Sequence, residues 1–166
     1  MAAKRRKTLS LKIQDGNGAY RAATSDEIIQ AAIKAINRRF LKGKALTSPK
    51  DAREFFKLHL AHLEHEVFSI LWLDNRHRVI TFEELFRGTI NGTSVHPREV
   101  VKSALINNAA ACILAHNHPS GDSKPSEADR CLTARLKDAL SLVDVRVLDH
   151  IIVAADYVSF AEQGLL

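Results

Sequence analysis

Apolar residues repeat along this 166-residue chain with two different spacings. Where they recur every three or four residues the pattern predicts amphipathic helices, and where they form short continuous or alternating runs it predicts strands. The predicted helices are residues 24–40, 48–63, 97–108 and 126–142. The predicted strands are residues 67–73, 79–86, 109–115 and 145–154. Because helices and strands alternate, we expect an α/β fold with a mixed sheet.

Three segments follow from the same pattern. Residues 1–23 show neither spacing and contain the turn cluster Asp15-Gly16-Asn17-Gly18, so we expect a flexible, poorly ordered arm. Residues 24–44 are predicted to form an N-terminal helix. Residues 45–166 hold the remaining helices and all of the predicted strands, which indicates one compact domain.

Charge separates the same segments. Residues 1–44 contain 11 Lys and Arg against 3 Asp and Glu, a net of +8, whereas residues 45–166 contain 13 against 16, a net of −3. A basic arm can bind nucleic acid by releasing counterions from phosphates, and it can equally be a solubilising tail. The sequence leaves both interpretations open for residues 1–22.

Composition restricts the class of protein and its location. No apolar run approaches the roughly 20 residues that a membrane-spanning helix needs, and no apolar signal core follows the basic N-terminus. The two cysteines, Cys112 and Cys131, have no Cys-x-x-Cys spacing. We interpret them as a core residue and a helix residue in a reducing compartment, so we expect a cytoplasmic protein.

The strongest chemical signal is a pair of histidines at the end of a predicted strand. His116 and His118 are two residues apart, so they share a face, and a polar loop leads from them to Ser126 and Asp129. Two imidazoles and a carboxylate, with a water molecule in the fourth position, are a common catalytic zinc site. Ser126-x-x-Asp129 also has the spacing of a helix cap, and Ser48-x-x-Asp51 shows that this spacing occurs without histidines. Both roles are compatible.

A hydrolytic zinc site also needs a general base, which is usually a carboxylate. Glu66 directly precedes the apolar strand at residues 67–73, where an unpartnered charge would be costly, and Glu64 is its nearest rival. His59, His62 and His65 recur every third residue, and we interpret them as a solvent-exposed helix face.

Asp149 and His150 begin the apolar part of the last strand. They are either a hydrogen-bonded pair that fixes the sheet, which we favour, or a pair that orients a zinc ligand. A nucleobase deaminase is excluded, because the chain lacks the required His-x-Glu and Pro-Cys-x-x-Cys motifs.

Glu66, His116-x-His118-Pro119 and Ser126-x-x-Asp129 together resemble the JAMM signature of the JAB1/MPN+ zinc metalloprotease superfamily, with seven residues between His118 and Ser126. The strand at Glu66 is similar to the superfamily's Glu-x-Cys-Gly-Ile-Leu segment, although Phe and Ser replace Cys-Gly. The closer resemblance is to the RadC-like branch and covers about residues 45–166. The segments that carry it are residues 96–99, 116–122, 125–126 and 149–152.

The resemblance implies a curved mixed β-sheet packed by helices, similar in architecture to cytidine deaminases. It implies Zn²⁺ bound by His116, His118 and Asp129. Glu66 would take a proton from the zinc-bound water, and Ser126 would hydrogen-bond the developing oxyanion. The superfamily cleaves amide or isopeptide bonds, so the implied substrate is a peptide or protein.

The RadC-like branch is historically linked to DNA repair. Longer relatives carry an N-terminal helix-hairpin-helix region that we do not find here, so the chain looks like the short, single-domain form. The resemblance therefore leaves a second hypothesis. In it, the chain is a metal-containing binding or scaffold module that associates with DNA-processing complexes through its basic arm.

Overall fold

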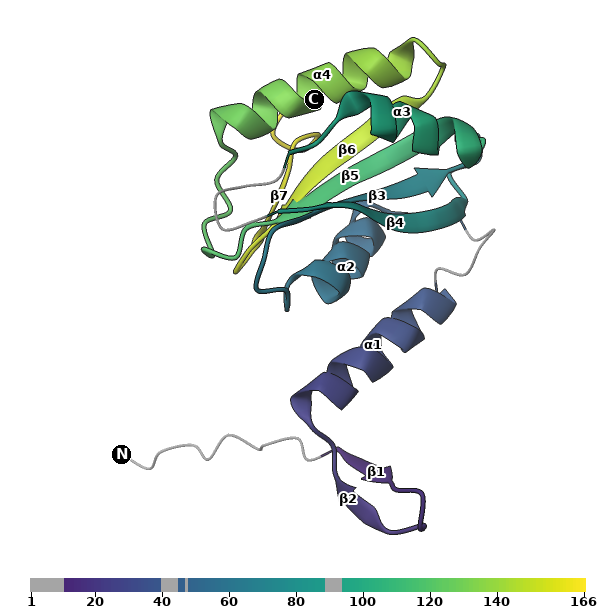
Figure 1. Cartoon of the computed structure of the whole chain (residues 1–166), viewed down its shortest axis with the longest axis vertical. Helices are drawn as coiled ribbons and strands as arrows, with labels where there is room; N and C mark the ends of the chain where they lie inside the picture. The colour runs from purple at the N-terminus through teal and green to yellow at the C-terminus, as the bar shows by residue number, and fades with distance from the viewer. Residues whose placement is uncertain (1–10, 40–44, 47, 89–93) are drawn as a thin grey trace.

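The structure, a computed structural model, describes residues 11–39, 45–46, 48–88 and 94–166. Within these ranges a two-stranded hairpin and a helix precede an α/β domain (Figure 1). The helices are α1 Ser25–Arg39, α2 Pro49–Leu60, α3 Pro97–Ile106 and α4 Glu127–Ser141. The strands are β1 Lys12–Gln14, β2 Tyr20–Ala22, β3 Val67–Leu73, β4 Val79–Arg87, β5 Ala111–Asn117, β6 Arg146–Val153 and β7 Tyr157–Ser159.

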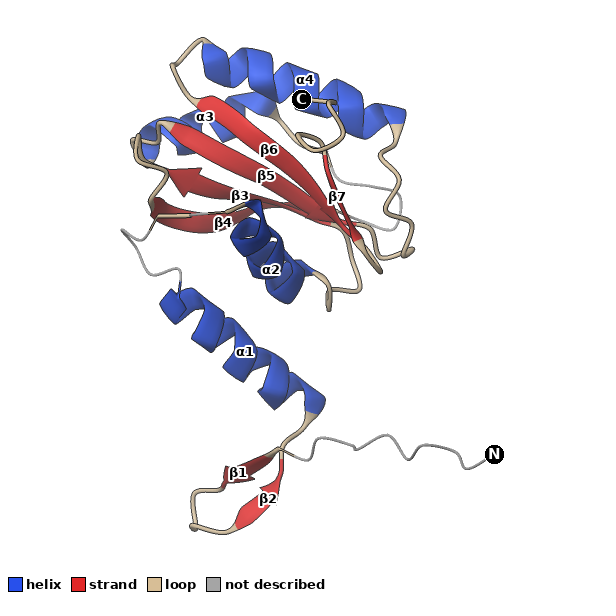
Figure 2. Cartoon of the chain, turned by 180° about the vertical axis from the view of Figure 1, so that it is seen from behind, coloured by secondary structure: helices blue, strands red, loops and turns tan. Residues whose placement is uncertain are grey.

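The domain is built on a five-stranded sheet in the order β4-β3-β5-β6-β7. All neighbouring strands are antiparallel except β5 and β6, which are parallel and are connected through α4. The sheet is therefore mixed, and the α/β class expected from the sequence is confirmed. Helices α3 and α4 cover one face and α2 covers the other (Figures 1 and 2).

Both faces of the central strands are buried, which explains why β3 and β5 read as continuous apolar runs. On the face toward α2, the core includes Leu71 and Ile113. On the face toward α3 and α4, it includes Trp72 and Leu114. Because side chains alternate along a strand, His116 lies on the same face as Leu114, beneath α4.

Helix α2 begins as its sequence predicts, with Pro49 in its first turn and the Ser48 side chain accepting a hydrogen bond from the Asp51 amide. The interpretation of His59 as solvent-exposed is wrong. Its ring is buried, stacks on Phe55 with ring centroids 4.2 Å apart, and its Nδ1 lies 2.8 Å from the Phe55 carbonyl oxygen. His59 follows Phe55 by four residues and Phe56 by three, so it lies within the apolar stripe of α2 and not on an exposed face.

The N-terminal segment is more regular than we expected. Residues 12–14 and 20–22 form an antiparallel hairpin, and Gly18 adopts a positive φ of 84° in the turn between the strands. The turn was predicted correctly, but the flanking strands were missed because each has only three residues. Residues 1–10, and the predicted end of the first helix at residues 40–44, lie outside the described ranges.

Two further differences concern the C-terminal half. Strand β5 continues to Asn117, two residues past the predicted end, because it pairs with β6 through that residue. The three-residue strand β7 was not predicted.

No helix in the described ranges combines the length and the apolar character needed to cross a membrane.

Candidate metal centre

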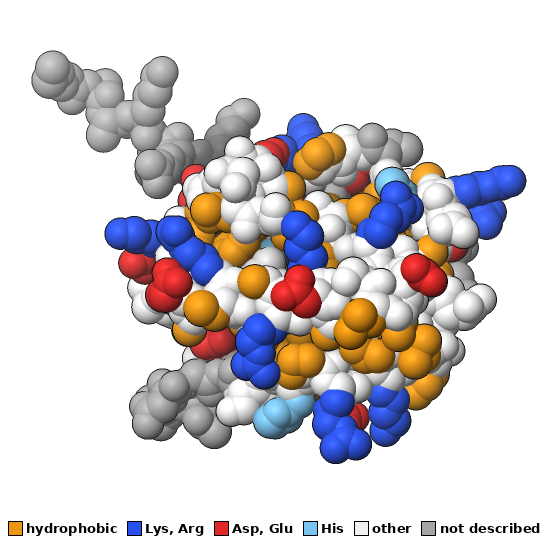
Figure 3. Space-filling view, turned by 90° about the horizontal axis from the view of Figure 1, so that it is seen from above, with side chains coloured by type: hydrophobic (Ala, Val, Ile, Leu, Met, Phe, Trp, Pro, Cys, Tyr) orange, Lys and Arg blue, Asp and Glu red, His pale blue; other side chains and the backbone are white. Residues whose placement is uncertain are grey.

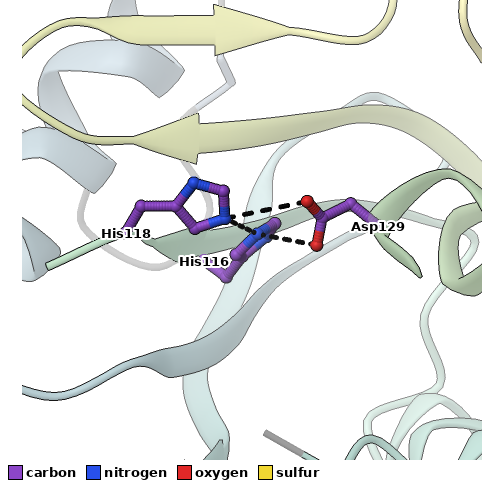
Figure 4. Close-up of side chains that lie close together, drawn as sticks. All are labelled: His116, His118 and Asp129. Atoms are coloured by element: carbon purple, nitrogen blue, oxygen red, sulfur yellow. Dashed lines mark hydrogen bonds and ion pairs between the residues drawn. The ribbon is translucent and has the colours of Figure 1, made fainter. Parts of the chain in front are cut away.

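The side chains of His116, His118 and Asp129 meet where β5 ends and α4 begins (Figure 4). The Nε2 atoms of the two histidines are 3.0 Å apart. Asp129 Oδ1 is 3.2 Å from His116 Nε2, and Asp129 Oδ2 is 3.7 Å from His118 Nε2. The three residues that the sequence pattern selected as ligands are therefore brought together.

Helix α4 delivers Asp129 because its N-terminus is capped at this point. Ser126 Oγ accepts the Asp129 amide at 3.1 Å, and the Asp129 carboxylate accepts the Ser126 amide at 2.8 Å. This reciprocal capping box confirms the interpretation of Ser126-x-x-Asp129 as a helix cap. Ser126 Oγ also lies 2.6 Å from Asp129 Oδ2. Burial raises the pKa of Asp129, but His116 and Ser126 outweigh burial and hold this pKa well below its usual range.

The ring of His118 is oriented by the loop that follows it. Its Nδ1 lies 2.7 Å from the Asp122 carbonyl oxygen, which can only accept a hydrogen bond. His118 Nδ1 is therefore the donor, and in the neutral ring Nε2 carries the lone pair that points at Asp129. Gly121, with a positive φ of 84°, lets the loop turn back toward His118.

The ring of His116 is held from the protein interior. Its Nδ1 lies 2.8 Å from Nε2 of His150, whose Nδ1 lies 2.6 Å from Thr133 Oγ1. Burial lowers the pKa of His150 well below its ordinary value and His116 lowers it further, so the His150 ring is neutral. Asp149 and His150 therefore have different roles. His150 contacts the ring of His116, whereas the Asp149 carboxylate accepts hydrogen bonds from Ser159 Oγ and the Ala161 amide and so fixes the C-terminal turn.

The donor set suits zinc. Two imidazole nitrogens and a carboxylate oxygen lie within 4.8 Å of one another, and the three side chains point toward one another (Figure 4). Without a cation between them, whether a proton or a metal ion, these atoms would repel one another at the observed distances. His116 is almost fully buried, whereas the side chains of His118 and Asp129 keep 18% and 13% of their surface exposed, so solvent reaches one side of the cluster.

That side opens into a cleft of about 830 Å³. Its lining residues include Glu64, Glu66, His118 and Ser126. Glu66 reaches the cleft because of strand register. Phe68 pairs with His116 across β3 and β5, so continuing the ladder by two residues places Glu66 beside His118 on the same face. The sequence-predicted base and its rival, Glu64, thus share the cleft with His118.

Sequence reasoning missed the residue that holds the start of β3 in place. Asn117, between the two histidines, accepts the Val67 amide at 2.8 Å through Oδ1 and donates to the His65 carbonyl at 2.9 Å through Nδ2. It is buried and fixes the backbone on both sides of Glu66. The signal in the sequence that could have found it is its place between His116 and His118, directly after an apolar run.

Among its described residues, the surface over α3 and α4 carries no second group of this kind. Figure 3 views the molecule from above, over α3 and α4, where acidic and basic side chains are interspersed with apolar ones. The exposed apolar residues of this region, Leu105, Ile106 and Leu142, lie at or just beyond the ends of these two helices. Among the described residues, only His116, His118 and Asp129 form a group that could hold a metal ion.

The fold and the site define a class of α/β domain with a His-x-His and aspartate cluster at the carboxyl end of a sheet strand. Comparison with known proteins agrees with that class. The family model described as "RadC-like JAB domain" matches residues 46–165. The chain belongs to this family.

The relatives carry names that state no activity. The chain is 56% identical over 151 residues to a UPF0758 protein of Thioalkalivibrio sulfidiphilus, covering 91% of this chain and 68% of the relative. It is 53% identical over 144 residues to a UPF0758 protein of Vibrio cholerae, covering 87% and 91%. A UPF0758 protein of Nitrosococcus oceani is 63% identical over 126 residues, covering 75% of this chain and 56% of the relative.

Proposed function

We propose that this chain is a JAMM-type zinc-dependent metallohydrolase that cleaves an amide bond in a peptide or protein. The observation that supports it most strongly is the convergence of His116 Nε2, His118 Nε2 and the Asp129 carboxylate beside an open cleft. A purely structural zinc site is usually closed by four protein ligands. Here His116, His118 and Asp129 would supply three ligands and leave a fourth for water or substrate, and Glu66 and Ser126 line the adjacent cleft.

Zinc held by these residues would polarise the amide carbonyl and make a water molecule acidic near neutral pH. Glu66 takes a proton from the attacking water as oxygen adds to the carbonyl carbon. The same carboxyl group then gives this proton to the leaving nitrogen as the carbon–nitrogen bond breaks. Ser126 Oγ, which now contacts Asp129 Oδ2, turns toward the cleft and donates to the developing oxyanion.

Metal content is the first test. Protein purified without chelator should contain about one zinc per chain, and His116→Ala and Asp129→Ala should lose it because each removes one of three ligands. His62→Ala is a matched control, because His62 is exposed and is not part of the cluster. Elemental analysis that finds no transition metal in the wild-type protein would contradict the proposal.

The second test separates the base from the ligands. Glu66→Gln should keep zinc, because Glu66 is outside the ligand cluster, but hydrolysis in a broad peptide screen should fall by about 100-fold or more. Glu64→Gln is the matched control, since Glu64 lines the same cleft and should keep most of the activity. Loss of zinc in Glu66→Gln, or full activity, would show that the base is misassigned.

The same variant distinguishes the second hypothesis. The observation in its favour is the net charge of +8 on residues 1–44 beside a domain of net −3. A metal-containing scaffold that associates with DNA-processing complexes would not need a base. In that case Glu66→Gln would leave zinc content and partner binding unchanged.

A further inference from the structure

We propose that Thr133 and His150 are positioning residues that fix His116 in the one tautomer able to bind the metal. The inference rests on the proposed zinc site, but it concerns a chain of hydrogen bonds that the protein forms by itself. These hydrogen bonds connect three elements, since Thr133 belongs to α4, His150 to β6 and His116 to β5.

Thr133 determines which atom donates and which accepts in each of these hydrogen bonds. Its Oγ1 lies 2.6 Å from the carbonyl oxygen of Asp129, one helical turn earlier. A carbonyl oxygen only accepts, so the single hydroxyl hydrogen of Thr133 is used there. Toward His150 Nδ1, also 2.6 Å away, Thr133 Oγ1 must therefore act as the acceptor. His150 consequently carries a hydrogen on Nδ1.

The next step follows from the surroundings of His150. The ring is fully buried and packs against the aromatic rings of Phe68 and Phe160. Within the described part of the chain, no carboxylate hydrogen-bonds to it, so a positive charge there would lack a direct partner. A neutral ring with hydrogen on Nδ1 has a lone pair on Nε2. That lone pair accepts the hydrogen of His116 Nδ1 at 2.8 Å, which leaves His116 Nε2 free to coordinate.

The consequence concerns metal affinity. A neutral imidazole can carry its hydrogen on either nitrogen, and hydrogen on Nε2 would block coordination by His116. The hydrogen bonds from Thr133 through His150 to His116 remove this alternative before metal arrives. They also couple two ligands, because Thr133 bonds to the backbone of Asp129 while His150 bonds to the ring of His116. Residues in such positions typically alter metal affinity by about 10–100-fold when replaced.

The experiment compares variants of the full chain by zinc competition titration. Thr133→Val keeps the side-chain shape, removes the hydroxyl, and should weaken zinc binding by about 10–100-fold. His150→Leu should weaken binding at least as much. His150→Gln should restore part of the affinity, because its amide offers one acceptor to His116 and one donor to Thr133. Ser69→Ala is the control, since it removes a buried hydroxyl that donates to the Ala115 carbonyl.

A second readout is independent of both zinc and activity. Long-range ¹H–¹⁵N NMR of the metal-free wild-type protein should show His150 with hydrogen on Nδ1, and Thr133→Val should change that pattern. The proposal is overturned if wild-type His150 carries its hydrogen on Nε2, or if folded Thr133→Val binds zinc as tightly as wild type. Should His150→Leu fail to fold, Thr133→Val and His150→Gln decide the outcome. Absence of zinc from the wild-type protein would refute the proposed function, while the His150 tautomer would still decide this inference.

Discussion

Replacing Asn117 by alanine should destabilise the protein and impair hydrolysis without removing the metal ligands. The side chain satisfies the Val67 amide at 2.8 Å and the His65 carbonyl at 2.9 Å, with a longer contact of 3.4 Å to the Leu63 carbonyl. Leaving a buried polar group without its partner costs about 1–3 kcal/mol. We expect the two unpaired groups, partly hydrated by water entering the space, to lower the free energy of unfolding by about 2–4 kcal/mol.

Chemical denaturation measures this loss directly, and Asn75→Ala in the exposed turn between β3 and β4 is the matched control. For a chain of this length, a 2–4 kcal/mol loss lowers the melting temperature by roughly 4–16 °C. Because Asn117 holds the backbone around Glu66, hydrolysis by the folded variant should fall more than its zinc affinity. A stability within about 0.5 kcal/mol of wild type would refute the reasoning, since surface substitutions change stability by no more than that.

Two further predictions concern other parts of the chain. Burial lowers the pKa of His59 below 6.5, so the unfolded chain binds more protons, and stability should fall as pH drops below about 6.5. Between pH 8 and pH 5, the denaturation midpoint of His59→Gln should depend less on pH than that of the wild-type protein. An equal pH dependence in both proteins would contradict the prediction. Deletion of residues 1–22 should abolish any non-specific nucleic-acid binding, whose affinity should fall by about 0.9 log unit per log unit of salt for each phosphate contacted. Gel-shift binding that survives the deletion would indicate a basic patch on the folded domain instead.

The sequence predicted the domain well where a pattern was long. The helices at 25–39 and 127–141 and the strands at 67–73 and 146–153 appear close to their expected bounds, because each repeats its apolar spacing over at least seven residues. The three-residue strands β1, β2 and β7 could not be found that way. A strand that short is defined by its pairing partner, which the sequence pattern does not identify.

The candidate ligands were predictable for a different reason. His-x-His at the end of an apolar run places two imidazoles on one face of a strand, and a cap motif places Asp129 in the first turn of the following helix. Thr133 and His150 gave only a weak signal, because a lone buried threonine or histidine is common in ordinary cores. Their contact with His116 depends on the register between β5 and β6, in which His150 pairs with Leu114, two residues before His116.

The segment from His116 to His118 accounts for much of how the site is built. Alternation along the strand directs the two histidines toward α4, whereas Asn117 points the other way and bonds to the backbone on either side of Glu66. One short segment therefore supplies two candidate ligands and also positions the strand that carries the candidate base. The two functions act through different contacts, with His150 and Thr133 behind His116 and the start of β3 beside Asn117. Substitutions at Thr133 should consequently act on zinc affinity, and substitutions at Asn117 on the catalytic rate, which makes the two contributions separable by experiment.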